Sequence, residues 1–173
     1  FLFLLLIYLF TRQKNFDIFV STLFIYNICL LWNAIASVYF NVFNDQQYMG
    51  QDSGFFFELS KGAIFINPML FGTNFYDGIG AVNFWKLFYD LFALVGFSKL
   101  PYIGLTINTI LVSLSGLFSM KMVHIIYPGD TIRLYRFLIL FTSCGLLMLF
   151  ASTRLRDAFV LLFVTLQSYG WIK

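Results

Sequence analysis

The chain has 173 residues, of which 60% are hydrophobic and only 11% are charged, with 11 Lys and Arg against 8 Asp and Glu. Soluble domains carry about 25% charged residues, so this chain has too few charges to cover a water-exposed surface. The composition excludes a soluble globular enzyme, a disordered chain and a nucleic-acid-binding protein. It predicts an all-α, polytopic bundle of transmembrane helices. The chain begins at Phe1 within an apolar segment, so we interpret it as a fragment of a longer protein.

Uncharged runs predict where the chain crosses the bilayer. A charged Asp, Lys or Arg at mid-membrane costs about 2.5–3.5 kcal/mol, and roughly 20 apolar residues cross the hydrocarbon core. Three runs are long enough for complete spans, and one run at each end of the chain is shorter. The predicted spans are 1–11, 18–43, 101–120, 137–153 and 158–172.

The segment 45–100 differs from the spans because it holds most of the acidic residues and most of the glycines. We expect a long external loop here, with interfacial helices at 54–61 and 79–97. In the second of these, apolar residues recur at helical spacing, and Lys86 and Asp90 lie one turn apart. This pattern is typical of an amphipathic helix in the plane of the interface. A spanning or re-entrant course for the second segment stays open.

The basic residues predict the orientation. The loops at 12–17 and 121–136 each carry an excess of Lys and Arg, which is typical of the cytoplasmic side. The long acidic loop and the connection at 152–157 then lie outside. Arg154 and Arg156 break the positive-inside bias in that connection, and this is the sharpest anomaly in the sequence.

Acidic residues of the external loop form the first candidate site. Asp52 precedes an aromatic helix, and a carboxylate in such a place is a candidate general base for a hydroxyl or a cation ligand. Asp45 is the second choice, and Glu58 is a candidate substrate contact on the helix itself. Alternatively, Asp52 caps the helix at 54–61 and Asp45 is a solvated loop acid.

The stretch from Ser152 to Asp157 forms the second candidate site. Arginine recognises phosphate bidentately, so Arg154 and Arg156 are candidate ligands for an anionic lipid or a diphosphate. Asp157 is expected to pair with Arg154 or to cap the last helix. The alternative is that both arginines extend their head groups toward the membrane face.

The histidine and the two cysteines are expected to have structural roles and no catalytic or metal-binding role. The sequence has no Gly-rich phosphate loop and no His or Cys spacing of a zinc site, so we predict no metal site. Cys29 and Cys144 lie in apolar runs and are expected to be small core residues. His124 is expected to be solvated or to face head groups.

Four short motifs between residues 45 and 172 carry a family resemblance. They are Asp52-Ser53 through Leu59, Gly72-Thr73-Asn74-Phe75, Tyr127-Pro128-Gly129-Asp130 and Ser152 through Phe159. In this order the chain resembles the polytopic membrane proteins of bacterial capsule, exopolysaccharide and O-antigen synthesis. Many of these are GT-C-type glycosyltransferases or repeat-unit polymerases. The chain departs from the family pattern after Asp52, where phenylalanines replace a second acid or a tyrosine.

The resemblance implies an enzyme of the plasma membrane that uses a polyprenyl-phosphate-linked sugar donor. Asp52 would be the base, with Asp45 as second choice, and Arg154 and Arg156 would bind the lipid phosphate. It implies no organic cofactor, leaves a divalent metal open, and implies the bilayer and other envelope-polysaccharide proteins as partners. A transporter of lipid-linked oligosaccharide and a non-catalytic subunit of a synthesis complex are the alternative functions.

Overall fold

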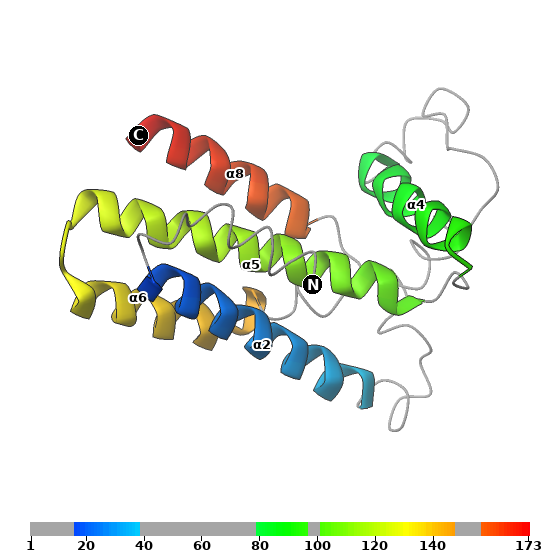
Figure 1. Cartoon of the computed structure of the whole chain (residues 1–173), viewed down its shortest axis with the longest axis horizontal. Helices are drawn as coiled ribbons and strands as arrows, with labels where there is room; N and C mark the ends of the chain where they lie inside the picture. Colours follow the sequence, from blue (N-terminus) through cyan, green and yellow to red (C-terminus); the bar gives the residue numbers. More distant parts are fainter. Residues whose placement is uncertain (1–15, 39–78, 97–100, 148–156) are drawn as a thin grey trace.

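The computed structural model describes residues 16–38, 79–96, 101–147 and 157–173 (Figure 1). Within these ranges 92% of the residues are helical and no strand occurs, which confirms the all-α class. The helices are α2 (Phe16–Val38), α4 (Ile79–Leu94), α5 (Pro101–Ile126), α6 (Thr131–Ser143) and α8 (Asp157–Ile172). The expected span at 1–11 and the expected helix at 54–61 lie outside the described residues.

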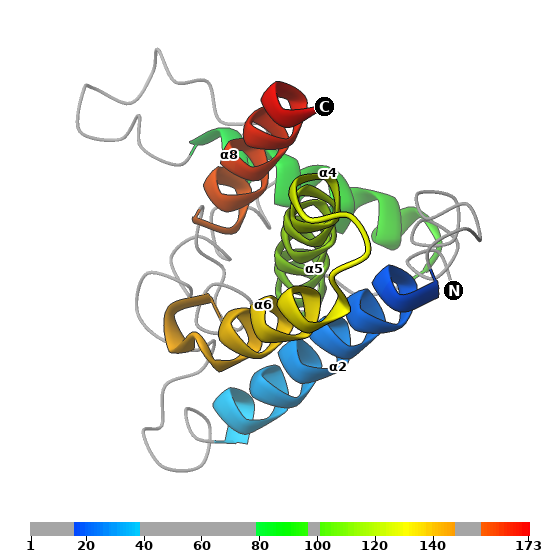
Figure 2. The same cartoon turned by 90° about the vertical axis from the view of Figure 1, so that its left-hand side faces the viewer.

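Helix α5 is the centre of the fold. It contacts α2, α4, α6 and α8, and α2 also contacts α6. In Figures 1 and 2, α5 and α8 run in one direction while α2 and α6 run in the opposite direction. The assembly therefore has two distinct ends. The turn end holds the starts of α2 and α6 and the ends of α5 and α8, whereas the α4 end holds their opposite termini together with α4.

A four-residue turn joins α5 to α6, so the connection is shorter than the loop expected at 121–136. Helix α5 continues past Lys121 to Ile126, and α6 begins at Thr131. Gly129 has a φ of +81°, a left-handed conformation that glycine adopts without a steric penalty. The Asp130 side chain then accepts a hydrogen bond from the Arg133 backbone N–H at 3.0 Å and caps α6.

The ends of α4 and α6 also differ from the expected boundaries. Helix α4 ends at Leu94, and Gly96, with a φ of +90°, closes its last turn. Helix α6 ends at Ser143 because Cys144 is extended, although the span was expected to run from 137 to 153. Residues 145–147 are again helical.

Two helices in the described ranges are long and apolar enough to cross a membrane, judged by length and composition. They are Asp17–Ala36 within α2 and Ile103–Ile126 within α5. Helix α8 is apolar but shorter. Large apolar side chains are exposed on every described helix, and Phe24, Leu31 and Trp32 of α2 are examples.

Hydroxyl groups inside the bundle are satisfied by their own helices. Thr22 donates to the Ile18 carbonyl at 2.7 Å, and Ser113 donates to the Thr109 carbonyl at 2.7 Å. Ser115, Thr142, Thr165 and Ser168 each donate to the carbonyl four residues earlier in the same way. Such bonds let a helix place a hydroxyl among apolar side chains without leaving it unpaired.

Gly116 marks the closest approach of three helices. A Cβ at this position would lie 2.7 Å from Ile25 Cδ1 of α2 and 3.3 Å from Phe141 Cε1 of α6. The absent side chain therefore lets α2 and α6 pack against the same turn of α5. Gly170 of α8 has no atom within 4 Å of the equivalent position.

We expect Gly116→Leu to destabilise the protein by about 1–3 kcal/mol, because the larger side chain forces α2 and α6 away from α5. Gly170→Leu is the matched control, since its side chain enters open space. Thermal unfolding in detergent, followed by tryptophan fluorescence, compares the two. Equal midpoints for both variants would show that the three helices do not pack closely at Gly116.

Candidate functional site at the α4 end

Helix α4 presents two different faces. Its buried face carries the larger polar and aromatic groups, and consists of Val82, Trp85, Lys86 and Tyr89. Its exposed face is apolar and consists of Leu87, Leu91, Leu94 and Val95. The helix was expected to be amphipathic, and the structure shows that the face directed into the protein is the one that carries the lysine.

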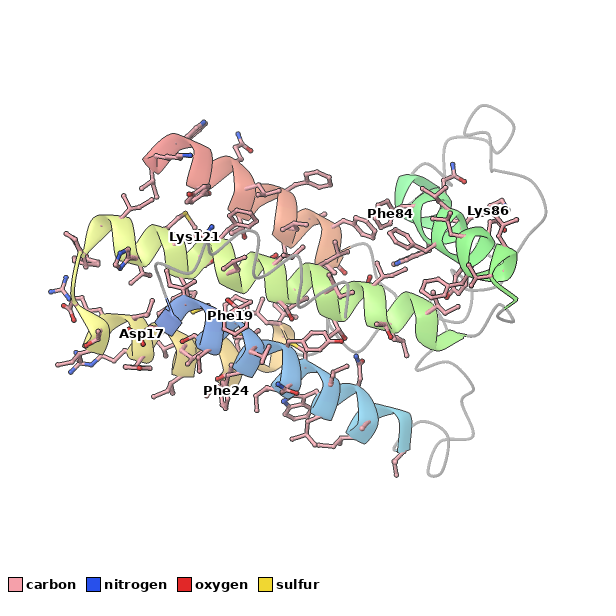
Figure 3. All side chains as sticks on the ribbon, in the orientation of Figure 1. Asp17, Phe19, Phe24, Phe84, Lys86 and Lys121 are labelled. Carbon is pink, nitrogen blue, oxygen red and sulfur yellow. The ribbon has the colours of Figure 1, made fainter. Side chains whose placement is uncertain are left out.

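Lys86 and Asp90 form an ion pair on this helix. Figure 3 labels Lys86 on α4. Its Nζ lies 2.7 Å from Asp90 Oδ2, and the lysine side chain is 2% exposed while the aspartate side chain is 37% exposed. An ammonium group away from water requires a counter-charge, because desolvation costs several kcal/mol per ion. The pair therefore places a fixed positive charge inside the α4 end and a carboxylate at its edge.

Two hydrogen bonds connect α4 to α5. Trp85 Nε1 donates to Asn108 Oδ1 at 3.2 Å, and the Gly104 backbone N–H donates to the Tyr89 hydroxyl at 3.2 Å. Gly104 lies in the first turn of α5, so this bond ties α4 to the start of that helix. The rings of Trp85 and Tyr89 are both fully buried.

A third connection joins α5 to α2. The Asn33 amide donates to the Thr109 hydroxyl, next to the residue that accepts from Trp85. The other atom of this amide, Asn33 Oδ1, is buried without a hydrogen-bond partner. The polar residues of α5 therefore tie it to α2 on one side and to α4 on the other.

The start of α8 packs against α4. Phe159 lies edge-on to Phe84 with ring centroids 4.8 Å apart, and edge-on to Trp85 at 5.7 Å. Asp157 is the first residue of α8, where the helix dipole favours a carboxylate. It is half-buried, and it is the predicted site residue that the structure describes.

The other predicted site residues lie outside the described residues. They are Asp45, Asp52, Glu58, Arg154 and Arg156. Their roles remain predictions, as does the pairing of Asp157 with Arg154. In the part of the chain that the structure describes, no three His, Cys, Asp or Glu side chains come together as a metal site.

The sequence did not identify Lys86 and Asp90 as candidate residues. Their spacing was recognised, but both were assigned to the polar side of an interfacial helix. A usable signal was present: Trp85, Lys86 and Tyr89 occupy one helical stripe, and tryptophan and tyrosine need hydrogen-bond partners when buried. The α4 end therefore brings together the buried ammonium of Lys86, the partly exposed carboxylate of Asp90 and the N-terminus of α8.

Comparisons with known proteins assign neither a family nor a function to the chain. No family model matches the chain, and searches of curated proteins and of solved structures return no match. The family resemblance therefore depends on the four short motifs. The site depends on the contacts described above.

We expect Asp90→Ala to destabilise the protein by about 1–3 kcal/mol, because it removes a carboxylate that balances a buried ammonium. A double-mutant cycle with Lys86→Met should give a coupling energy of the same size. The exposed pair Asp130–Arg133, with side chains 35% and 50% exposed, is the matched control. Its coupling should stay below about 1 kcal/mol.

Denaturation by SDS in mixed micelles measures both cycles. Equal coupling energies for the two pairs would contradict the structural role assigned to the Lys86–Asp90 pair.

Proposed function

We propose that the chain belongs to a multi-span membrane enzyme of cell-envelope polysaccharide synthesis, with its reacting site at the α4 end. The proposed substrate is a sugar carried on a polyprenyl phosphate. The supporting observation is that the described helices expose large apolar side chains while polar residues of α5 are buried, and that the motif Ser152 through Phe159 leads into α8 at the α4 end.

The distribution of polar groups supports the membrane assignment. Soluble monomers rarely expose large contiguous apolar patches, yet α2, α4, α6 and α8 all expose large apolar side chains. Asn108, Thr109, Ser113 and Ser115 of α5 are buried instead. Hydrogen bonds between and within helices are the usual way to satisfy such groups in lipid.

The order of the helices supports a reacting site at the α4 end. The motif Ser152 through Phe159 leads directly into α8, and Phe159 of that motif packs on Phe84 and Trp85 of α4. The acidic loop precedes α4 in the chain. Both candidate sites therefore connect to helix termini at the same end of the bundle.

The proposed mechanism is a displacement at the anomeric carbon of the donor sugar. Asp52 accepts the proton of an acceptor hydroxyl, whose oxygen forms the new glycosidic bond as the bond to the lipid phosphate breaks. Arg154 and Arg156 bind the leaving phosphate, whose negative charge grows in the transition state. Trp85 and Tyr89 hold α4 against α5 at the end of the bundle where this site is proposed.

The structure offers less support for a transporter. Transport pathways usually depend on polar residues near mid-membrane that face a cavity. Asn33 and Asn108 are the relevant residues in α2 and α5, and each is engaged with a neighbouring helix. They serve to hold the bundle together.

Cysteine labelling in intact cells tests the arrangement of the two ends. In a Cys144→Ser background, a membrane-impermeant maleimide should label Asp52→Cys and Arg154→Cys from outside. It should label Arg136→Cys, near the turn end, only after permeabilisation. Cys29 is fully buried and serves as an internal background. Labelling of Asp52→Cys and Arg154→Cys from opposite sides would rule out a composite site.

We expect Asp52→Ala and Arg154→Ala each to reduce polysaccharide output by about 100-fold or more, the scale of a lost general base or charge contact. The full-length protein should be tested in its own cell, with protein level measured by immunoblot. Asp130→Asn is the control, because that acid caps α6 at the opposite end. Normal polysaccharide in both alanine variants would overturn the proposed enzyme function.

A further inference from the structure

Helix α2 leaves most of its surface uncovered. It packs against α5 and α6 through one face, on which Ile18, Ile25 and Cys29 are buried. Most of the apolar span Asp17–Ala36 is exposed, whereas most of the corresponding span of α5 is buried. Figure 3 labels Phe24 on the side of α2 that is directed away from α5. Helix α2 therefore has a long free face.

The free face of α2 follows a regular spacing. Its residues recur at alternating intervals of four and three positions, and each of them is exposed: Val20, Phe24, Asn27, Leu31, Ala34 and Val38. This alternation is the heptad spacing with which two helices pack side by side, knobs into holes. We call these six residues the α2 stripe. It runs along almost the whole helix and contains no charged residue.

The only polar member of the α2 stripe is Asn27, which lies near the middle of the span. It is ten residues from Asp17 and nine from Ala36, which corresponds to about 15 Å and about 14 Å along the helix axis. An asparagine side chain is too short to reach either end of the span. Asn27 Nδ2 donates to the Leu23 carbonyl at 2.8 Å, and its Oδ1 forms no hydrogen bond with a described residue.

Lipid can cover the apolar residues of the α2 stripe but cannot satisfy this amide. Acyl chains contain no hydrogen-bond donor or acceptor, so a polar group that faces them is left unpaired at a cost of free energy. Asparagine side chains within a membrane usually form hydrogen bonds with a neighbouring helix for this reason. Asn27 therefore favours a helix on the free face, although the other five residues are equally suited to lipid.

A second copy of the chain offers the matching amide. Asparagine carries both a donor and an acceptor, so two Asn27 side chains related by a two-fold axis complement each other. Copies inserted in the same direction are related by an axis along the membrane normal, and their α2 helices are then parallel. Each residue of the α2 stripe faces its own counterpart in this arrangement. Because the stripe is uncharged, no like charges meet.

We propose that the protein forms a two-fold symmetric dimer in the membrane through the α2 stripe, with Asn27 hydrogen-bonded to Asn27 of the second copy. This inference rests on the membrane assignment within the proposed function and is independent of the proposed catalysis. A single asparagine in an apolar heptad seam also fixes the register of the two helices. The two copies then have their α4 ends at the same membrane surface.

Energy transfer in vesicles measures the association. Full-length proteins labelled at the amino terminus with a donor or an acceptor dye are reconstituted together in phosphatidylcholine and diluted with lipid. Asn27→Leu should weaken the dimer by about three- to tenfold, because it removes the hydrogen bonds between the helices. Asn27→Gln keeps an amide and should retain most of the association. Trp32→Leu is the control, since Trp32 is exposed but lies outside the stripe.

Disulfide cross-linking tests which face is used. In a Cys144→Ser background, Phe24→Cys and Leu31→Cys place a thiol on the stripe on either side of the central amide. Both should give a cross-linked dimer on mild oxidation in vesicles. Trp32→Cys should not, because it lies about 100° around the helix from Leu31. Cys29 is fully buried and does not reach a second copy.

Three outcomes would overturn the dimer. They are energy transfer that Asn27→Leu leaves unchanged, cross-linking of Trp32→Cys as efficient as that of Leu31→Cys, and a protein that stays monomeric in both assays. The last outcome assigns the stripe to lipid or to another segment of the same chain. Flotation with the vesicles separates these results from failure of the membrane assignment: a monomeric protein that floats contradicts only the dimer, whereas a protein that does not float contradicts the membrane assignment itself.

Discussion

Helix α5 must satisfy the polar groups that it buries from within the protein, and this constraint shapes the rest of the structure. Asn108, Thr109, Ser113 and Ser115 are all fully buried on it. The hydroxyls of the two serines turn back to carbonyls of α5 itself. The side chains of Asn108 and Thr109 accept hydrogen bonds from other helices instead. Trp85 of α4 donates to Asn108, and Asn33 of α2 donates to Thr109. The polar residues of α5 therefore determine which residues of α2 and α4 pack against it.

Apolar packing then fixes the distances that these hydrogen bonds require. Gly116 brings Ile25 and Phe141 onto the same turn of α5, and Phe159 brings α8 onto α4. In a lipid environment apolar side chains gain little by leaving lipid for protein, so close fit and hydrogen bonds contribute more to association than burial does. The interfaces accordingly combine buried polar residues such as Asn108 with closely fitted apolar ones such as Ile25 and Phe141.

Much of the helical framework follows from the sequence. The start of α5 at Pro101 and the extent of α8 agree closely with the expected uncharged runs. The turn between α5 and α6 was expected to be longer, because Lys121 and Arg136 were assumed to lie outside helices. Both are helical: charges near helix ends can extend toward polar surroundings without ending the helix. Asp130, which follows Pro128 and Gly129, was a readable capping signal.

The orientation of α4 could not be obtained from periodicity. A repeat of apolar residues predicts that a helix has two faces, but it does not say which face packs against the protein and which lies on its surface. The contacts with α5 determine the orientation of α4. Trp85 donates a hydrogen bond to Asn108, and Tyr89 accepts one from the Gly104 backbone N–H. The face that carries these two residues therefore turns inward, together with Lys86. The roles of Asp52 and Arg154 depend on residues outside the described ranges and remain predictions.

The scarcity of charge gives the two ends of the bundle different characters. At the α4 end the described cation, Lys86, is buried and paired with Asp90, whose carboxylate is partly exposed. At the turn end Arg136 and Lys173 are exposed, and among the described residues the basic side chains there outnumber the acids Asp17 and Asp130. A helix bundle with such a difference has one preferred orientation in an asymmetric field of anionic lipid. Among the described residues, the exposed positive charge therefore lies at the end opposite to the start of α8.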